Sequence, residues 1–176
     1  MDKINIRAAA GCDLERVMDF YHSLIDAMKD AEYKPGWKKG IYPTRESIAD
    51  YIAAGELYIG ESDGQIVSSM AVNHEFNEGY RSAGWSVDAG SSELLVIHIL
   101  GVRYNLSGSG IAAQMVRFVI DKARRDCMKA IRLDIIEGNL PAEKAYTKFG
   151  FSYRETVKMF YDDTGWMDFK LFEYII

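Results

Sequence analysis

The sequence predicts a mixed α/β fold, and three observations on its 176 residues indicate it. Short segments rich in β-branched and aromatic residues, bounded by Gly, Asp or Ser, are typical of strands. Longer segments between some of them repeat their apolar residues at helical spacing. Glu93–Val102 is an almost unbroken apolar run, as expected of a central strand buried on both faces. Together these patterns predict a mixed sheet with roughly four helices.

Four segments are expected to be helical. Asp13 is expected to cap the first helix, because a carboxylate there can accept hydrogen bonds from the first backbone amides. The second helix starts at Thr44 and ends at Gly55, a residue suited to a helix C-terminus. The third follows a glycine turn, and the fourth begins at Asn139 and stops at Gly150. The apolar face of the first helix consists of Leu14, Val17, Met18, Tyr21, Ile25 and Met28.

Seven strands are expected, separated by turns and by two long loops at residues 31–43 and 77–92. The last two strands flank a hairpin turn of sequence Asp-Asp-Thr-Gly. The chain contains no internal repeat or obvious linker, so we expect a single domain over residues 1–176. The expected strands are Ile4–Ala8, Glu56–Glu61, Gln65–Asn73, Glu93–Val102, Ile131–Glu137, Phe151–Phe160 and Met167–Tyr174.

The composition excludes several classes of protein. Hydrophobic residues make up 48% of the chain, which is enough to bury a core without metal or disulfides. The net charge of -5 and the lack of a basic stripe argue against nucleic-acid binding. No apolar stretch approaches the roughly 20 residues that a membrane span needs. The cysteines, Cys12 and Cys127, form no CxxC pair, so we expect a cytoplasmic protein without a disulfide framework or a metal.

The segment Asn105–Gly110 joins the predicted central strand to the third helix. The first turn of a helix exposes backbone amides without partners, at the positive end of the helix dipole. Glycines let such a backbone approach a diphosphate closely. The alternative is that Gly108 and Gly110 only form a tight turn. The sequence lacks the Gly-Lys-Ser/Thr ending of a P-loop and the third glycine of the dinucleotide fingerprint.

Two segments resemble the motifs of the GNAT superfamily of N-acetyltransferases. His98–Ala112 is similar to the family's motif strand followed by Gln/Arg-x-x-Gly-x-Gly/Ala. Asn139–Phe151 is similar to the family's Asn-x-x-Ala-x-x-x-Tyr-x-x-x-Gly-Phe pattern. The two segments follow in the right order, with one helix and one strand between them. Asn105 departs from the pattern, which usually has Gln or Arg there, but the expected phosphate contacts are backbone ones.

The resemblance implies a GNAT-like fold: a mostly antiparallel seven-stranded sheet, flanked by about four helices and splayed between its two central parallel strands. It also implies acetyl-CoA as co-substrate and no metal. The pantetheine arm is expected to lie along the central strand at Leu100 and Val102, with Asn139 and Ala142 on its other side. The pyrophosphate is expected at the amides of Leu106, Ser107, Gly108, Ser109, Gly110 and Ile111.

Tyr146 is the leading catalytic candidate, because it stands at the tyrosine of the second motif. Attack on a thioester expels a thiolate, whose conjugate acid has a pKa near 8.5. A phenol with an ordinary pKa near 10 can supply the proton. The alternative is that Tyr146 is a core aromatic residue.

The base that accepts the proton of the amine is left open between two residues. His98 is the polar side chain inside the apolar run, on the face of Val96 and Leu100 by strand alternation, and its ordinary pKa near 6.5 suits a base. It could equally be a core histidine. Glu93 begins the same strand, and family members often use a carboxylate there. His74 and Glu75, after the preceding strand, are a third option.

The resemblance implies transfer of an acetyl group to a primary amine, on a small molecule or a peptide, in a ternary complex. The alternatives are a non-catalytic acyl-CoA-binding regulatory module on the same fold and an interaction protein. Asp162 and Asp163 form a hairpin turn that could also face a cationic acceptor. The last strands could pair across a homodimer. Aromatic residues of the long loops could line the acceptor site or pack under the loops: Tyr33, Trp37, Tyr42, Tyr80 and Trp85.

Overall fold

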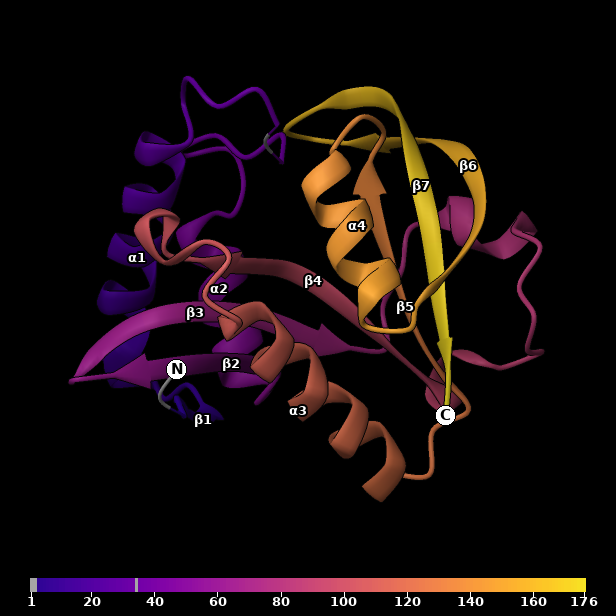
Figure 1. Ribbon diagram of the computed structural model, residues 1–176, viewed down its shortest axis with the longest axis horizontal. Coiled ribbons are helices and arrows are strands. Elements are labelled where there is room, and N and C mark those ends of the chain that lie inside the picture. The colour runs from indigo at the N-terminus through magenta and orange to yellow at the C-terminus, as the bar shows by residue number, and fades with distance from the viewer. Residues whose placement is uncertain (1–2, 34) are drawn as a thin grey trace. The chain divides into compact units, whose positions relative to one another are not determined.

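The computed structural model describes residues 3–33 and 35–176, and within them it has four α-helices and seven strands, as predicted (Figure 1). The strands form one sheet in the order β1-β2-β3-β4-β5-β7-β6. The helices are α1 (Leu14–Ala27), α2 (Arg45–Ala53), α3 (Ile111–Arg125) and α4 (Leu140–Lys148). The strands are β1 (Asn5–Ala8), β2 (Leu57–Ser62), β3 (Gln65–Asn73), β4 (Leu94–Val102), β5 (Ala130–Ile136), β6 (Ser152–Tyr161) and β7 (Gly165–Ile175).

The sheet is mostly antiparallel, and β4 and β5 form its parallel pair, which confirms the predicted fold class. Their register covers only three residues of each strand, from Leu94 opposite Ala130 to Val96 opposite Arg132. Such a short parallel register is expected of central strands that separate. None of the helices in the described residues is both long and apolar enough to cross a membrane.

The described residues gather into two compact units. The first contains residues 3–31, 37–72 and 98–119, and the second contains residues 32–33, 35–36, 73–97 and 120–176. Strand β4 and helix α3 continue from one unit into the other. The single domain over the whole chain stays a prediction.

Helices α1 and α2 cover one face of strands β1–β3 in the first unit. Alternation along β2 directs Leu57 and Ile59 to this face, where both side chains are fully buried. Tyr58 and Gly60 face the opposite side, where α3 lies: the ring of Tyr58 packs 5.1 Å from that of Phe118. A Cβ at position 60 would clash first with Ser68 and Ile4 and would also press on Met115 of α3, so the packing here leaves room only for glycine.

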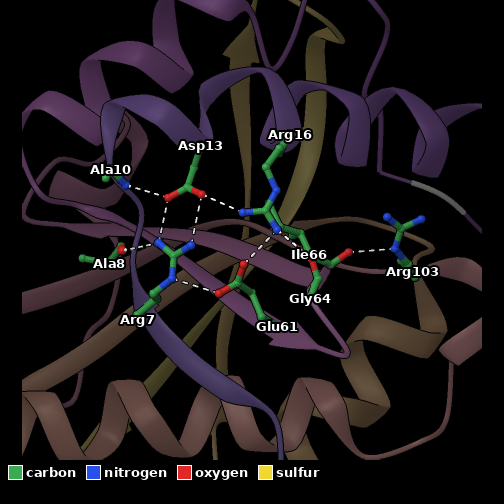
Figure 2. A network of polar contacts seen from close by, with 9 residues as sticks. All are labelled: Arg7, Ala8, Ala10, Asp13, Arg16, Glu61, Gly64, Ile66 and Arg103. Atoms are coloured by element: carbon green, nitrogen blue, oxygen red, sulfur yellow. Dashed lines mark hydrogen bonds and ion pairs between the residues drawn. The ribbon is translucent and has the colours of Figure 1, made fainter.

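Four charged side chains tie the start of α1 to the sheet in the first unit (Figure 2). Asp13 accepts hydrogen bonds from Arg7 of β1 at 2.7 Å and from Arg16 of α1 at 2.8 Å. Glu61 of β2 pairs with the same two arginines, each at 2.9 Å. Asp13 precedes α1 as predicted, but its carboxylate makes no cap bond to that helix. It accepts instead from the amide of Ala10, and so closes the 3-10 turn Gly11–Asp13.

Replacing Asp13 by Asn is expected to destabilise the protein at neutral pH and to matter less in acid. Hydrogen bonds from Arg7 lower the pKa of Asp13, so the stabilisation is present above the unfolded pKa near 4 and is lost as the pH falls below it. We expect a loss of about 1–3 kcal/mol at pH 7. Urea unfolding at pH 7 and near pH 3 measures the difference. Asp50→Asn, an exposed carboxylate on α2, is the control. An equal loss for Asp13→Asn at both pH values would contradict the assignment.

The second unit has different partners on the two faces of its strands. Helix α4 lies over one face, where Lys170 of β7 pairs with Glu143 of α4 at 2.8 Å (Figure 1). The segment 74–93 covers the other face through its backbone: Val87 accepts a hydrogen bond from Arg132 at 2.7 Å. An apolar cluster fills this second face, and its buried members are Tyr80, Leu94, Val96, Met159, Phe169 and Leu171.

Arg132 and Glu173 form a closed ion pair inside the second unit. Their side chains are 5% and 1% exposed, and the Arg132 Nε to Glu173 Oε1 distance is 3.1 Å. The second carboxylate oxygen accepts from the amide of Ser86 at 2.8 Å, and the guanidinium lies 4.2 Å from the centre of the Trp85 ring. Every charge here has a partner, as burial demands. The pair therefore fixes the segment 74–93 on the sheet.

Candidate active site

The glycine turn of the first unit has the local geometry that an amide cradle needs. The chain leaves β4, makes the 3-10 turn Tyr104–Leu106 and enters α3 at Ile111. Gly108 and Gly110 have φ of 76° and 85°, values that side chains rarely adopt. A Cβ at Gly108 would meet no atom within 4 Å, so the backbone there is open to a ligand.

The amides of the turn divide into two sets. Those of Leu106, Ser107 and Ser109 donate to carbonyls inside the turn, at 2.9–3.2 Å. The predicted cradle of six amides therefore has three members engaged in shaping the loop. Within the described part of the chain, the amides of Gly108 and Gly110 donate to no carbonyl. These two, with the first-turn amides of α3, are the donors that could face an anion.

The charges along α3 suit a diphosphate at its N-terminus. The first turn carries no acidic side chain, and the last turn carries Lys122, Arg124 and Arg125. A carboxylate in the first turn would compete with a bound anion for the same amides, and none is there. The turn is tied to the sheet at Arg103, whose Nε donates to the Ile66 carbonyl at 2.7 Å (Figure 2). The residues present therefore fit the pyrophosphate of coenzyme A.

Strand β4 changes character in its second half. Its first four residues are buried, and from His98 onward alternate residues are half-buried. Ile99 has φ of 48°, a genuine outlier for a β-branched residue. The Ile99 carbonyl accepts a hydrogen bond at 2.9 Å from the buried phenol of Tyr21 on α1, and this contact holds the backbone in place. Such outliers concentrate at functional sites.

His98 lies just before this outlier, so simple alternation does not carry past it to Leu100. Its ring stacks on that of Tyr51 from α2, with 6.3 Å between centroids and 20° between planes. The side chain is half-buried, unlike Val96, which was expected on the same face and is fully buried. Leu100 and Val102, the residues expected along the pantetheine arm, are half-buried as well.

Glu93 belongs to the 3-10 turn Ser91–Glu93, and β4 begins one residue later than predicted, at Leu94. Its carboxylate accepts a hydrogen bond from the Gly90 amide at 2.9 Å, which closes the turn. It also pairs with Lys129 at 2.7 Å. The Lys129 ion pair, with the Gly90 amide, lowers the pKa of Glu93. A carboxylate engaged in this way is a weak proton acceptor.

Helix α4 of the second unit carries the remaining predicted residues. Asn139 is its N-cap, and its side-chain oxygen accepts from the amide of Ala142 at 3.3 Å. The side chain expected beside the pantetheine arm thus also fixes the start of the helix. Tyr146 lies two turns further on and is 8% exposed. The left-handed Gly150 ends this segment, with φ of 97°, as the motif predicts.

Tyr146 is held by aromatic packing. Its ring meets those of Phe149 and Phe151 edge-on, at 6.3 and 5.5 Å. Its hydroxyl makes no hydrogen bond to residues 3–33 or 35–176. Burial, followed by the charge of Asp134, raises the pKa of Tyr146. The phenol therefore stays protonated throughout the physiological range and can act only as a proton donor.

Residues 20–151 match the model of the acetyltransferase (GNAT) family. The chain belongs to this family. The match spans the glycine turn and Tyr146, the two places where the sequence resembles the family's motifs.

Solved structures of GNAT proteins share the fold at low identity. A GNAT acetyltransferase of Streptococcus agalactiae 2603 has a TM-score of 0.81 and 22% identity, with 98% of this chain and 95% of that chain covered. Ribosomal-protein-alanine N-acetyltransferase of Brucella melitensis has a TM-score of 0.70 and 19% identity, with 98% and 99% covered. The acetyltransferase yncA of Salmonella typhimurium, solved with its cofactor acetyl-CoA, has a TM-score of 0.69 and 15% identity, with 99% and 94% covered.

The GNAT motifs do not include three residues that the second unit brings together. Asp134 of β5 accepts hydrogen bonds from the phenols of Tyr80 and Tyr161, at 2.8 and 2.9 Å. In the sequence Asp134 lies between Leu133 and Ile135, and its partners are 54 and 27 positions away. The available signal was a pair of charged residues, Arg132 and Asp134, at alternate positions of a mainly apolar strand.

Aromatic residues of the long loops pack against other aromatic or apolar residues in this GNAT fold. Trp37 packs edge-on against Tyr21 at 5.7 Å, and Tyr42 packs on the same apolar cluster of the first unit. Tyr80 and Trp85 pack 5.2 Å apart in the second unit. The described residues contain no group of three or more His, Cys, Asp or Glu side chains that could hold a metal ion.

Proposed function

We propose that the protein is an N-acetyltransferase that transfers an acetyl group from acetyl-CoA to a primary amine by direct attack in a ternary complex. The family match over residues 20–151 supports acetyl transfer. The observation that carries the proposal is the left-handed glycine turn at the start of α3, where the first helical turn has no acidic side chain to compete with an anion for the backbone amides.

The donor is assigned to the residues that the family motifs share with this chain. Gly108, Gly110 and Ile111 provide amides for the pyrophosphate, and Leu106, Ser107 and Ser109 hold the loop in shape. Leu100 and Val102 offer backbone groups to the pantetheine arm, and the family motif assigns Asn139 and Ala142 to the same arm. Acetyl-CoA supplies an activated thioester carbonyl carbon.

The chemistry needs two proton transfers that involve this chain's residues, one to a base and one from an acid. A base takes the proton that the amine nitrogen loses as the nitrogen–carbon bond forms. Tyr146 gives its phenolic proton to the sulfur as the carbon–sulfur bond breaks, and solvent restores that proton. An acceptor that enters as an ammonium ion first loses one further proton to water. The products are the acetamide and the free thiol.

We assign the base to His98 rather than to Glu93. Both oxygens of Glu93 are engaged, by the Gly90 amide and by Lys129, and its lowered pKa weakens it as a proton acceptor. His98 is half-buried on β4, directly before the left-handed Ile99. An imidazole has an ordinary pKa near 6.5, which suits a base at neutral pH. His98→Ala should therefore lower kcat/KM and remove the imidazole's part of its rise with pH, while the part due to loss of the ammonium proton remains; Glu93→Gln should leave both parts in place.

A thiol-release screen tests the proposed function. The protein is incubated with acetyl-CoA and a panel of amines: polyamines, amino acids, aminoglycosides and peptides with free N-termini. Turnover with one class identifies the acceptor. Calorimetry with coenzyme A runs in parallel. Binding without turnover across the panel would favour a regulatory acyl-CoA-binding module, and no binding at all would point to an interaction protein.

Replacing Gly108 by Val is expected to weaken coenzyme A binding about tenfold or more. A β-branched side chain at φ of 76° costs about 1–2 kcal/mol, and relieving that strain moves the amides of the turn. Calorimetric titration with coenzyme A measures the effect. Gly55→Val is the matched control, since Gly55 has φ of 72° at the end of α2 and equally open surroundings. Similar affinities of both variants for coenzyme A would contradict the assignment of the glycine turn to the donor site.

A further inference from the structure

The face of β5 turned toward the segment 74–93 carries two charged residues in succession. Arg132 and Asp134 alternate along the strand, so both point to the same side. Their register partners on β7 are Glu173 and Leu171. Arg132 has an acidic partner there and is fully neutralised by Glu173. Asp134 lies opposite a leucine, so the sheet gives it no such partner.

Asp134 is held by neutral groups only. Tyr80 and Tyr161 both donate their phenolic hydrogens to its Oδ2, at 2.8 and 2.9 Å. No ion pair joins Asp134 to a cationic side chain in the described ranges 3–33 and 35–176, and its Oδ1 accepts no hydrogen bond from them. A carboxylate costs free energy when it leaves water without a counter-charge. The two phenols offset only part of that cost.

Ring packing holds the two phenols beside Asp134. Phe76 stacks on Tyr80 with 5.7 Å between centroids, and Tyr161 meets Phe169 at 4.9 Å. These contacts keep both hydroxyls directed at the carboxylate. Burial raises the pKa of Asp134, the two phenols oppose the rise, and the charge of Asp163 adds to it.

We propose that Asp134, oriented by Tyr80 and Tyr161, binds the ammonium group of the acceptor. The proposal deepens the proposed function, on which it rests, by naming the acceptor class as cationic amines. Asp134 is half-buried, and its Oδ1 is the acceptor atom left for a ligand. An ammonium ion with three N–H donors would supply the counter-charge that the strand does not.

Asp134→Asn provides the main test, in steady-state kinetics with the acceptor that the thiol-release screen identifies. The change removes the charge and keeps the shape. We expect KM for a cationic acceptor to rise at least tenfold, while calorimetry shows unchanged affinity for coenzyme A. Asp168→Asn is the matched control: its carboxylate is exposed on β7 and belongs to the opposite face, with Lys170. An unchanged KM in Asp134→Asn would overturn the proposal.

Tyr161→Phe keeps the carboxylate and removes one hydrogen bond, so it serves if Asp134→Asn fails to fold. We expect a KM increase of about three- to tenfold, because one of the two hydrogen bonds that orient the carboxylate is lost and water replaces part of it. No change in KM for this folded variant would also contradict the proposal.

A binding experiment separates this proposal from the proposed function. Butylammonium and butanol have the same chain and differ in charge, so NMR titration of each against the full chain reports on the cation site without turnover. The wild type should prefer butylammonium, and Asp134→Asn should lose that preference. If the preference is absent from the wild type, the Asp134 assignment fails. If it is present and no amine in the screen is acetylated, the proposed function fails alone.

Discussion

Tyr146→Phe is expected to lower kcat about a hundredfold while coenzyme A binds as tightly as before. General acid catalysis contributes about 10²–10⁴ in rate, and loss of the phenolic hydrogen removes the proton donor without changing the ring. The ring packing on Phe149 and Phe151 survives the substitution, so the fold should too. Steady-state thiol release gives kcat, and calorimetry gives the affinity for coenzyme A.

Tyr174→Phe is the matched control for this experiment. Tyr146 and Tyr174 both pack on Phe151, at 5.5 and 5.4 Å, and each variant loses only a hydroxyl. The Tyr174 hydroxyl accepts a long 3.4 Å hydrogen bond from Arg124 at an exposed position. We expect its kcat to stay near the wild-type value. Equal rates for Tyr146→Phe and the wild type would contradict the catalytic role and indicate that Tyr146 is only a core aromatic residue.

The pH dependence of kcat follows from the raised pKa of Tyr146. Because burial keeps the phenol protonated well above its ordinary range, the acid produces no fall in rate up to at least pH 9. An alkaline fall that disappears in Tyr146→Phe would show that the phenol ionises more easily than its burial implies.

Arg132→Met is expected to cost about 3–5 kcal/mol of the free energy of unfolding, the largest loss among the stability variants. The substitution leaves the Glu173 carboxylate buried without its counter-charge. It also removes the hydrogen bond to the Val87 carbonyl and the cation stacked on Trp85. Urea unfolding followed by circular dichroism measures the change.

Two comparisons isolate the buried charge as the cause. The double variant Arg132→Met with Glu173→Leu removes both charges, and it should lose less stability than the sum of the two single variants. Lys170→Met breaks the half-buried Lys170–Glu143 pair on the other face, and it should cost only about 0–1 kcal/mol. Losses of the same size for Arg132→Met and Lys170→Met would argue against burial as the deciding factor.

The parts of this molecule that local pattern controls could be predicted. Three features are determined by residues close by in the chain: the apolar run of β4, the glycines at 108 and 110, and the segment Asn139 to Gly150. Helix ends behaved in the same way: Thr44 caps α2 through the amide of Ser47, and Gly55 follows its end with φ of 72°. These features need no distant partner, so the sequence displays them directly.

Features that depend on distant partners could not be predicted. Glu93 was a candidate base from its place at the start of the strand, but its carboxylate pairs with Lys129, which follows α3 in the chain. Ile99 favours an extended backbone by its residue type, yet its conformation is left-handed and its carbonyl accepts a hydrogen bond from the distant phenol of Tyr21. Asp134 is one of two charged residues on a mainly apolar strand, and the sequence does not show that Tyr80 and Tyr161 lie beside it. Each of these depends on tertiary contacts that pattern alone does not specify.

The hydrogen bond from Tyr21 to Ile99 connects α1 directly to the middle of β4. A phenol 78 positions earlier in the chain sets the direction of a backbone carbonyl in the middle of β4. Phe20 and Leu24 of the same helix lie directly against Gly101, so the helix and the strand fit together on two successive turns. Any displacement of α1 must therefore reshape the strand. Substitutions of Phe20, Tyr21 or Leu24 are therefore expected to change the strand without altering a residue of the motifs.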